Sequence, residues 1–366
     1  MPPIPNASAS GTAPLTAPLP AMGVSQSPRR LVDTLGHAQG RRCIVLTGPA
    51  GSGKTLLLQS WAARLDSQGI PVIRVGQAGP GQLGLVSSLL RRCLELDPAI
   101  ASSLPVPFPD DPGQAISYLS VALVRALSSS RKQIVLIFDE LHTLGHAREL
   151  RTLQPLLDYC PAGLQCVFAG REPPPLFLGR LRAYGGVLEL DAGDLHWTLE
   201  DTQQWARQQS PAIPDALCAD WHAASGGWCA GLHFLLRQHQ QGEGAAQQAP
   251  VQLPDAAWAH LQRDVLDGLA DADEVRQLAR LSLLDGIDAE FCSAICTMAM
   301  HDGVAMLERW RVRTGFVAND MSPRGATQWR ILPPLKPLLA RHFTQLDGAA
   351  QARAHGAACR EYARRG

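Results

Sequence analysis

The sequence predicts an α/β fold, in which a parallel sheet of about five strands carries helices on both faces and is followed by a mainly helical region. Compact apolar and β-branched runs alternate with helical stretches as far as residue 195, which is typical of parallel sheets buried on both sides. Beyond that point strand-like runs become rare and helical patterns dominate. The predicted strands cover residues 42–47, 71–75, 133–138, 164–169 and 187–190.

Helices are expected before, between and after these strands. One precedes the first strand, over residues 29–37, and one follows it, over 56–65. Thr198 begins the first helix of the C-terminal region, because its hydroxyl can cap the helix while Glu200 and Asp201 suit the positive end of the helix dipole. Further helices are predicted over 83–96, 115–127, 256–309 and 349–364, with a β-hairpin within 315–332.

The composition excludes several classes of protein. Lys and Arg together number 33 and Asp and Glu 33, whereas dedicated nucleic-acid binders carry a basic excess. No apolar stretch approaches the roughly 20 residues of a spanning helix, and the first 25 residues have no basic start, so neither a membrane span nor a signal peptide is expected. The nine cysteines contain no C-x-x-C pair, which favours a reducing, cytoplasmic location.

The strongest motif follows the first predicted strand directly. Residues 48–55 read GPAGSGKT, a complete Walker A pattern with a strand before it and a helix after it. Glycines let successive backbone N–H groups converge on one anion, Lys54 reaches the β- and γ-phosphates, and Thr55 offers a hydroxyl to Mg²⁺. The predicted nucleotide-binding residues are Gly48, Pro49, Ala50, Gly51, Ser52, Gly53, Lys54 and Thr55.

A second motif ends the third predicted strand. The apolar run 134–138 is followed by Asp139 and Glu140. Asp139 suits the Walker B role of holding Mg²⁺, together with Thr55. Glu140 suits the catalytic role of polarising the attacking water, which favours hydrolysis over a kinase-type reaction.

Two further residues are candidates for the same site. Arg171 follows the fourth predicted strand, at the sheet edge where ligands of open α/β sheets bind, and would sense or stabilise the γ-phosphate as a catalytic residue. The alternative is a surface arginine paired with a nearby carboxylate such as Glu172. His142 is predicted to line the nucleotide site, with a simply packed histidine as the alternative.

Four segments occur in an order that resembles a known family: GPAGSGKT at 48–55, FDELHTL at 138–144, GREPPP at 170–175, and the stretch 188–201. They resemble the STAND-class P-loop NTPase modules of the large ATP-dependent LuxR-type transcriptional regulators, a group that includes the maltose-regulon activator. The likeness continues through SGGWCAGL at 225–232, a winged-helix-like region around 281–339, and 353–366, which is similar to the first helix of the family's helical-repeat arm.

The resemblance implies a nucleotide-controlled switch. In such proteins ADP holds a closed monomer, inducer and ATP open it and allow self-association, and slow hydrolysis restores the closed state. The implied cofactors are therefore ATP or ADP with Mg²⁺. The implied partner, besides the nucleotide, is another copy in the ATP-bound state.

The sequence departs from the family in three respects. It stops where the inducer-sensing repeat arm begins and lacks the C-terminal DNA-binding domain, so direct DNA binding by this chain is not expected. Cys229 stands where many members have proline near the adenine, so the base pocket is expected to differ. Leu332 stands near the position of a histidine in many relatives, so the ADP-bound closed state is expected to be held less firmly.

The expected organisation rests on these motifs. The cations Arg309, Arg311 and Arg313 are interpreted as a solvated face of the winged-helix-like part rather than a DNA contact. The parts are a disordered leader (1–25), the P-loop NTPase core (26–195), a helical lid (196–240), a linker (241–254), a winged-helix-like domain (255–346) and the start of a helical-repeat arm (347–366).

Two alternative functions stay open from the sequence. One is a ring-forming AAA-type ATPase, which needs an arginine supplied by a neighbouring subunit. The other is a nucleotide-bound interaction scaffold without turnover. Turnover rate and nucleotide-dependent oligomer size distinguish them from the switch.

Overall fold

The computed structural model describes residues 26–38, 40–75, 133–144, 147–160, 163–242, 251–267, 272–296, 298–321 and 327–365, with short helical pieces between 89 and 128. The predicted leader and most of the predicted linker lie outside these residues, as do much of the predicted helices at 83–96 and 115–127 and the turn of the predicted hairpin.

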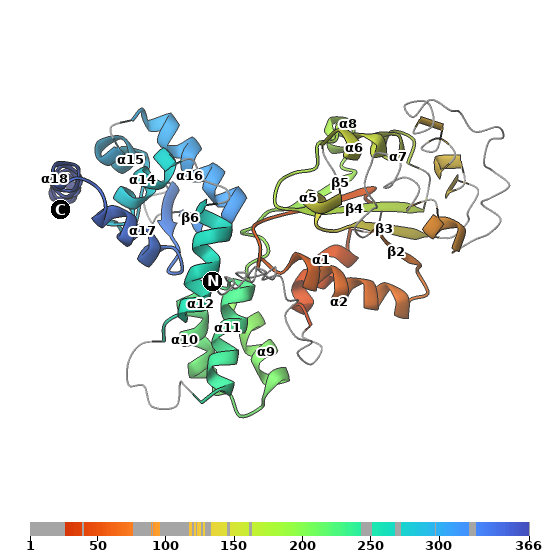
Figure 1. Ribbon diagram of the computed structural model, residues 1–366, viewed down its shortest axis with the longest axis horizontal. Helices are drawn as coiled ribbons and strands as arrows, with labels where there is room; N and C mark the ends of the chain where they lie inside the picture. Colours follow the sequence, from red (N-terminus) through yellow and green to blue (C-terminus); the bar gives the residue numbers. More distant parts are fainter. Residues whose placement is uncertain are drawn as a thin grey trace, which may run out of the picture.

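A five-stranded parallel sheet forms the N-terminal half, as predicted (Figure 1). Its strands run in the order β2-β3-β4-β1-β5, so β4 separates the strand that leads into the glycine-rich loop from the strand that ends at Asp139. In the register of β1 and β4, Thr47 lies opposite Gly170. The strands are β1 (Cys43–Thr47), β2 (Val72–Val75), β3 (Ile134–Phe138), β4 (Leu164–Gly170) and β5 (Val187–Leu190).

Successive side chains along each buried strand point to opposite faces of the sheet, so the strands contribute to two separate cores, one on each face. In β1, Ile44 and Leu46 pack with α1 (Arg29–Gly36) and α2 (Lys54–Ser67), whereas Cys43 and Val45 face the opposite layer. The helices of the opposite layer lie above the sheet in Figure 1: α5 (Leu141–Leu144), α6 (Ala147–Leu150), η2 (Arg151–Leu153), α7 (Gln154–Asp158) and α8 (Gly179–Ala183).

A helical region follows the sheet. It comprises α9 (Leu199–Gln209), α10 (Asp215–Ser225), α11 (Cys229–Gln240), α12 (Asp255–Leu261) and the π-helical turn η3 (Gln262–Leu266) that continues α12. Thr198 caps α9 as predicted: the Asp201 N–H donates to Thr198 Oγ1 at 3.1 Å, and the Thr198 N–H donates to the Asp201 carboxylate at 3.0 Å. This reciprocal pair is a capping box.

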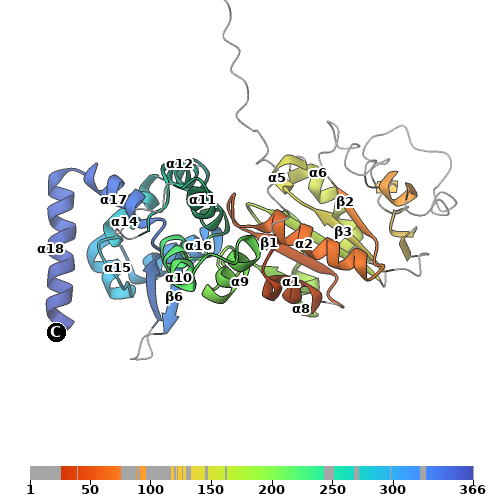
Figure 2. The ribbon, with the colours of Figure 1, turned by 90° about the horizontal axis from the view of Figure 1, so that it is seen from below.

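The C-terminal part combines helices with one hairpin. Strands β6 (Val317–Met321) and β7 (Thr327–Ile331) pair antiparallel, with Val317 opposite Ile331, inside the predicted hairpin range. The last helix packs on α15 and stands at the far end of the molecule from the sheet (Figure 2). The helices are α14 (Ala272–Leu281), α15 (Ala289–Cys296), α16 (Met300–Thr314), α17 (Lys336–Thr344) and α18 (Gly348–Arg365).

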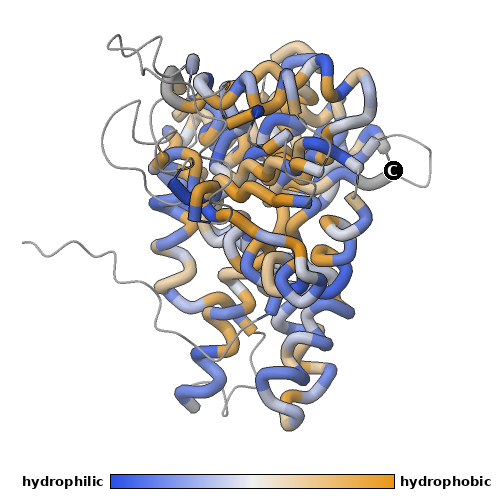
Figure 3. The backbone as a smooth tube through the Cα atoms, turned by 90° about the vertical axis from the view of Figure 1, so that its right-hand side faces the viewer, coloured by the Kyte–Doolittle hydropathy of each residue, from blue (hydrophilic) through white to orange (hydrophobic). Residues whose placement is uncertain are grey.

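One apolar core runs from the α1–α2 face of the sheet through α9–α12 into the C-terminal part. Figure 3 shows apolar strand segments enclosed by helices that carry hydrophilic stretches. In the part of the chain that the structure describes, no helix combines the length and the hydropathy that crossing a membrane requires.

Candidate functional site

The glycine-rich loop adopts the backbone curl that an anion site needs. Gly51 and Gly53 have φ angles of +78° and +91°, a region that favours glycine, and Gly53 caps α2. Helix α2 begins at Lys54, so the N–H groups of its first turn have no partner inside the helix. These donors, and the positive end of the α2 dipole, face the end of β1 where the loop lies.

Lys54 reaches back over this loop. Its ammonium donates to the carbonyl oxygens of Gly48 and Pro49, at 2.7 and 2.9 Å, and to Ser52 Oγ at 3.1 Å. Burial lowers the pKa of Lys54 to about 8, although the nearby carboxylates of Asp139 and Glu140 favour the charged form. The lysine therefore lies within the electrostatic reach of both predicted acidic residues.

Asp139 and Glu140 end β3 at the same edge of the sheet. The Glu140 N–H donates to the Asp139 carboxylate at 2.9 Å. Glu140 has a φ angle of +51° and is the non-glycine residue with positive φ among those described. Such a conformation costs about 1–3 kcal/mol and is concentrated at functional sites. Glu140, whose side chain is exposed, thus has this conformation directly after the metal-binding candidate Asp139.

Arg171 lies next to the glycine-rich loop because β4 is the direct neighbour of β1. The Gly48 N–H donates to the carbonyl of Gly170 at 3.2 Å, which fixes the two strand ends side by side. The guanidinium donates to Asp264 in η3 at 3.2 Å. The carboxylate that pairs with Arg171 is thus Asp264 rather than Glu172, which pairs with Arg313 at 3.4 Å.

The remaining predicted site residues are at the surface. Thr55, the second residue of α2, is exposed, as a hydroxyl available to a metal must be. His142 lies on α5 with an exposed side chain, and no contact joins it to the glycine-rich loop among the described residues. The structure thus brings the loop, Asp139, Glu140 and Arg171 to one edge of the sheet, and His142 follows Glu140 by two residues on α5.

The helical region covers the loop from the other side. The Ala230 N–H, in the first turn of α11, donates to the carbonyl of Gly51 at 3.0 Å. A Cβ at Gly51 would lie 2.8 Å from the Ala230 methyl group, so only glycine permits this approach. Helix α11 and the loop therefore form one contact surface.

Three functional candidates escape the sequence analysis: Trp228, His260 and Asp264. His260 Nε2 lies 3.3 Å from the carbonyl oxygen of Ala50, and its ring stacks on Trp228 with 5.6 Å between centroids. Each is remote in sequence from the glycine-rich loop. The only local signal is the four-residue spacing of His260 and Asp264, which places both on one helix face.

Two of the three family departures are single residues, Cys229 and Leu332, and both occupy ordinary packing positions. Cys229 begins α11 against Gly53, where a Cβ would meet its sulfur at 3.1 Å, and burial raises the pKa of its thiol to about 12. Leu332 is buried against Gly226. Both side chains are buried and contribute no charge to the site.

The arrangement fits a nucleotide with its metal. Free amides of the first turn of α2, the Lys54 ammonium and Arg171 supply the positive charge that phosphates require. Thr55 and Asp139 offer the oxygen ligands that Mg²⁺ prefers. The indole N–H of Trp228 is buried beside Gly51 without a hydrogen-bond partner within the described part of the chain, so a polar group is still needed there.

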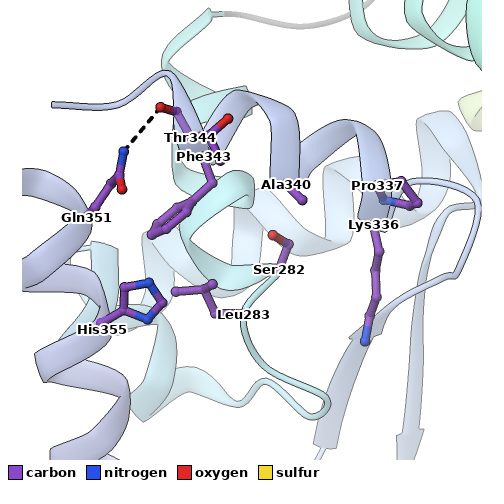
Figure 4. Close-up of a pocket in the computed structure, with 9 residues that line it drawn as sticks. All are labelled: Ser282, Leu283, Lys336, Pro337, Ala340, Phe343, Thr344, Gln351 and His355. Atoms are coloured by element: carbon purple, nitrogen blue, oxygen red, sulfur yellow. Dashed lines mark hydrogen bonds between the residues drawn. The ribbon is translucent and has the colours of Figure 1, made fainter. Parts of the chain in front are cut away.

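A separate pocket of about 540 Å³ lies in the C-terminal part, away from this chemistry (Figure 4). Its walls come from α17, α18 and the two residues that follow α14, with Phe343 and Leu283 as apolar lining. Lys336 at its edge is paired with Asp285 at 3.0 Å. The pocket contains none of the predicted site residues.

Comparison with known proteins agrees with the geometry. Residues 37–173 match the family model described as an AAA domain, and this range includes every predicted site residue. Over these residues the chain is therefore similar to an AAA domain, and for that likeness the sheet-bearing part, residues 26–195, is called the AAA domain below. The helical region and the C-terminal part lie outside the match, so the contacts of Ala230, His260 and Asp264 join the AAA domain to the helical region on its C-terminal side.

Relatives extend the likeness beyond the AAA domain. The chain is 25% identical over 336 residues to the HTH-type transcriptional regulator MalT of Serratia proteamaculans, covering 88% of this chain and 35% of that protein. It is 25% identical over 289 residues to the serine/threonine-protein kinase PknK of Mycobacterium tuberculosis, covering 76% of this chain and 25% of the kinase. The predicted resemblance to the P-loop modules of LuxR-type regulators is confirmed. The chain spans about a quarter to a third of these relatives' length.

The fold is shared with a solved structure. The Walker-type ATPase Paby2304 of Pyrococcus abyssi superposes with a TM-score of 0.51 at 12% identity, over 85% of this chain and 95% of that one. This likeness supports the arrangement of the AAA domain and the helices that come after it.

Proposed function

We propose that this chain is an ATP-binding, slowly ATP-hydrolysing switch module of a signal-dependent transcriptional regulator of the LuxR type. One observation supports the switch above simple nucleotide binding: the lid touches the phosphate-binding loop itself, through the Ala230–Gly51 hydrogen bond. A bound phosphate and the lid therefore act on the same backbone. Relatedness to MalT gives the regulatory context.

Each residue of the site has its own part in this proposal. Lys54 and the loop amides bind phosphates, and Thr55 and Asp139 hold Mg²⁺. Glu140 orients the attacking water, and Arg171 stabilises charge at the terminal phosphate. Rate enhancement by such a site is electrostatic and positional.

The domain boundaries of the proposal are those expected from the sequence. The P-loop core takes residues 26–195, the lid 196–240 and the winged-helix-like part 255–346, with a repeat arm beginning at 347. Self-association accompanies the ATP-bound state, and the module works in the cytoplasm.

The test is the nucleotide content of freshly purified protein, released by denaturation and measured with three variants. Wild type should carry close to one ADP or ATP per chain, and Lys54→Ala should carry almost none. Glu140→Gln should keep the nucleotide but lose turnover by roughly 100-fold or more, because it retains the shape and loses the base. Exposed Glu200→Gln is the matched control and should behave as wild type.

Two results would contradict the proposal. Wild type that is empty and does not bind added ATP with Mg²⁺ excludes nucleotide control altogether. Tightly bound ADP with no turnover in any variant favours the interaction scaffold instead.

A further inference from the structure

A single carboxylate stands at the junction of the AAA domain and the helices on its C-terminal side. Asp264 lies in η3, and its side chain is only 13% exposed. It accepts a hydrogen bond from Arg171 Nη2 at 3.2 Å, and His260 Nδ1 lies 3.2 Å away. The exposed Arg263 approaches from the solvent side at 3.1 Å. Isolated π-helical turns of this kind are frequent at functional sites.

His260 continues the connection to the loop. Its other ring nitrogen lies 3.3 Å from the carbonyl oxygen of Ala50, and Trp228 stacks on its face. Arg171, Asp264 and His260 therefore form a connected group, here called the carboxylate latch. The latch runs from the end of β4 to the phosphate-binding loop.

Arg171 has one guanidinium and two potential anionic partners. It lies beside the loop because Gly170 pairs with Thr47, and its positive charge acts to lower the pKa of Lys54. A terminal phosphate at this edge would attract the same guanidinium, since arginine pairs equally with carboxylate and phosphate. In this structure Asp264 holds it.

The two partners exclude one another electrostatically. While Asp264 pairs with Arg171, the charge of the guanidinium is largely neutralised, and a third phosphate would add negative charge near a carboxylate that is shielded from water. ADP lacks that phosphate. The latch is therefore compatible with ADP and opposed by ATP.

We propose that Asp264 competes with the γ-phosphate of ATP for Arg171, and that this competition makes the closed module prefer ADP. The inference rests on the proposed function, since it requires a nucleotide on the P-loop. Asp264 acts through Arg171 and is a positioning residue. Its loss changes which nucleotide is preferred, with nucleotide binding itself retained.

The first test is the ratio of two affinities in Asp264→Asn. ADP and the non-hydrolysable analogue AMP-PNP, each with Mg²⁺, displace a fluorescent ADP from the full chain. The asparagine keeps the shape and removes the charge, so the preference for ADP over AMP-PNP should fall about tenfold. The matched control is Asp267→Asn on the same helix, whose exposed carboxylate bonds only to Gln262 among the described residues and whose ratio should stay that of wild type.

The second test asks whether the effect passes through Arg171. In an Arg171→Gln background, adding Asp264→Asn should leave the ratio unchanged within about twofold, as double-mutant cycles show for residues that act together. A purely structural role for Asp264 would shift the ratio equally in both backgrounds. Should Asp264→Asn unfold, Asp264→Ala provides the same comparison, with thermal melting as the check on folding.

The outcomes separate this inference from the proposed function. An Asp264→Asn ratio equal to that of wild type, or the same shift in the Arg171→Gln background, overturns the latch while nucleotide control stands. Wild type that binds neither nucleotide overturns both.

Discussion

Lys54 shows how one residue prepares the site for phosphate. Its three donors are satisfied by Gly48, Pro49 and Ser52, all within its own loop. A phosphate that replaces these acceptors meets an ammonium already held in position. The cost of this arrangement is burial, which brings the pKa of Lys54 down to about 8.

This pKa predicts how nucleotide binding depends on pH. As pH rises through about 8, Lys54 loses its proton before nucleotide binds, so the Kd for ADP should increase by up to tenfold per pH unit. Titration with fluorescent ADP from pH 6.5 to 9.5 measures this effect. Lys54→Met should bind more weakly and show no such rise, whereas a flat profile for wild type would refute the role of the ammonium.

The lowered pKa of Lys54 affects folding in the opposite direction: a rise in pH weakens nucleotide binding but stabilises the folded chain. Between about pH 8 and the ordinary value of 10.5, the unfolded chain holds a proton on Lys54 that the folded chain has released. The contribution of Lys54 to the free energy of unfolding therefore rises with pH across this window. Below pH 8 the buried charge is a constant destabilising factor.

Helix α9 shows how an element is fixed at its end. The capping box of Thr198 and Asp201 satisfies the first turn, and Asp201 also accepts from Arg30 Nε at 3.0 Å. Arg30 lies on α1 and donates further to the carbonyl of His196 at 2.9 Å. The cap thus sets both the start of α9 and its position against the AAA domain.

Removing the cap should destabilise the lid. Thr198→Ala leaves the Asp201 N–H without its acceptor and should lower the free energy of unfolding by about 1 kcal/mol. Urea denaturation followed by circular dichroism measures the change. Ser67→Ala, at the exposed end of α2, is the control and should stay within about 0.5 kcal/mol of wild type. Equal losses in both variants would contradict the role of the cap.

Across the whole molecule, charged pairs join the AAA domain to the C-terminal part. Arg311 Nη1 lies 3.0 Å from the Asp191 carboxylate, and Arg313 pairs with Glu172. The interpretation of these arginines as a solvated face is therefore wrong for Arg311, whose side chain and partner are 26% and 17% exposed, whereas Arg313 and Glu172 form an exposed pair. The Ala192 N–H also donates to the carbonyl of Val312 at 3.4 Å, so α16 rests on the end of the sheet.

Breaking the Arg311 pair should loosen this docking. Asp191→Arg places two guanidinium groups together, so the radius of gyration from small-angle scattering should increase. Combining it with Arg311→Asp restores opposite charges and should recover the wild-type radius of gyration. The free energies of unfolding of wild type, the two single variants and the double variant should give a coupling free energy of about 1 kcal/mol. An unchanged radius in Asp191→Arg would show that the pair does not hold the two parts together.

Local patterns were enough to predict the elements of the AAA domain and the chemistry at its edge. Apolar runs bounded by glycine or acidic residues identified the strands, and β1 at Cys43–Thr47 lies within its predicted range. The Walker A loop and the pair Asp139–Glu140 are predictable from the sequence because their chemistry needs particular residue types at fixed spacing. Thr198 is predictable as a cap for the same reason, since a cap acts on residues three positions away.

Tertiary structure alone decided the strand order and the partners of Arg171. The pairing of β4 with β1 places Cys43 beside Cys166, which is 123 positions away in the sequence, and no local pattern encodes that choice. Asp264 meets Arg171 across 93 positions for the same reason. Propensity and capping act over a few residues, whereas the burial of one continuous core selects contacts over the whole chain, and the latch is a product of that selection.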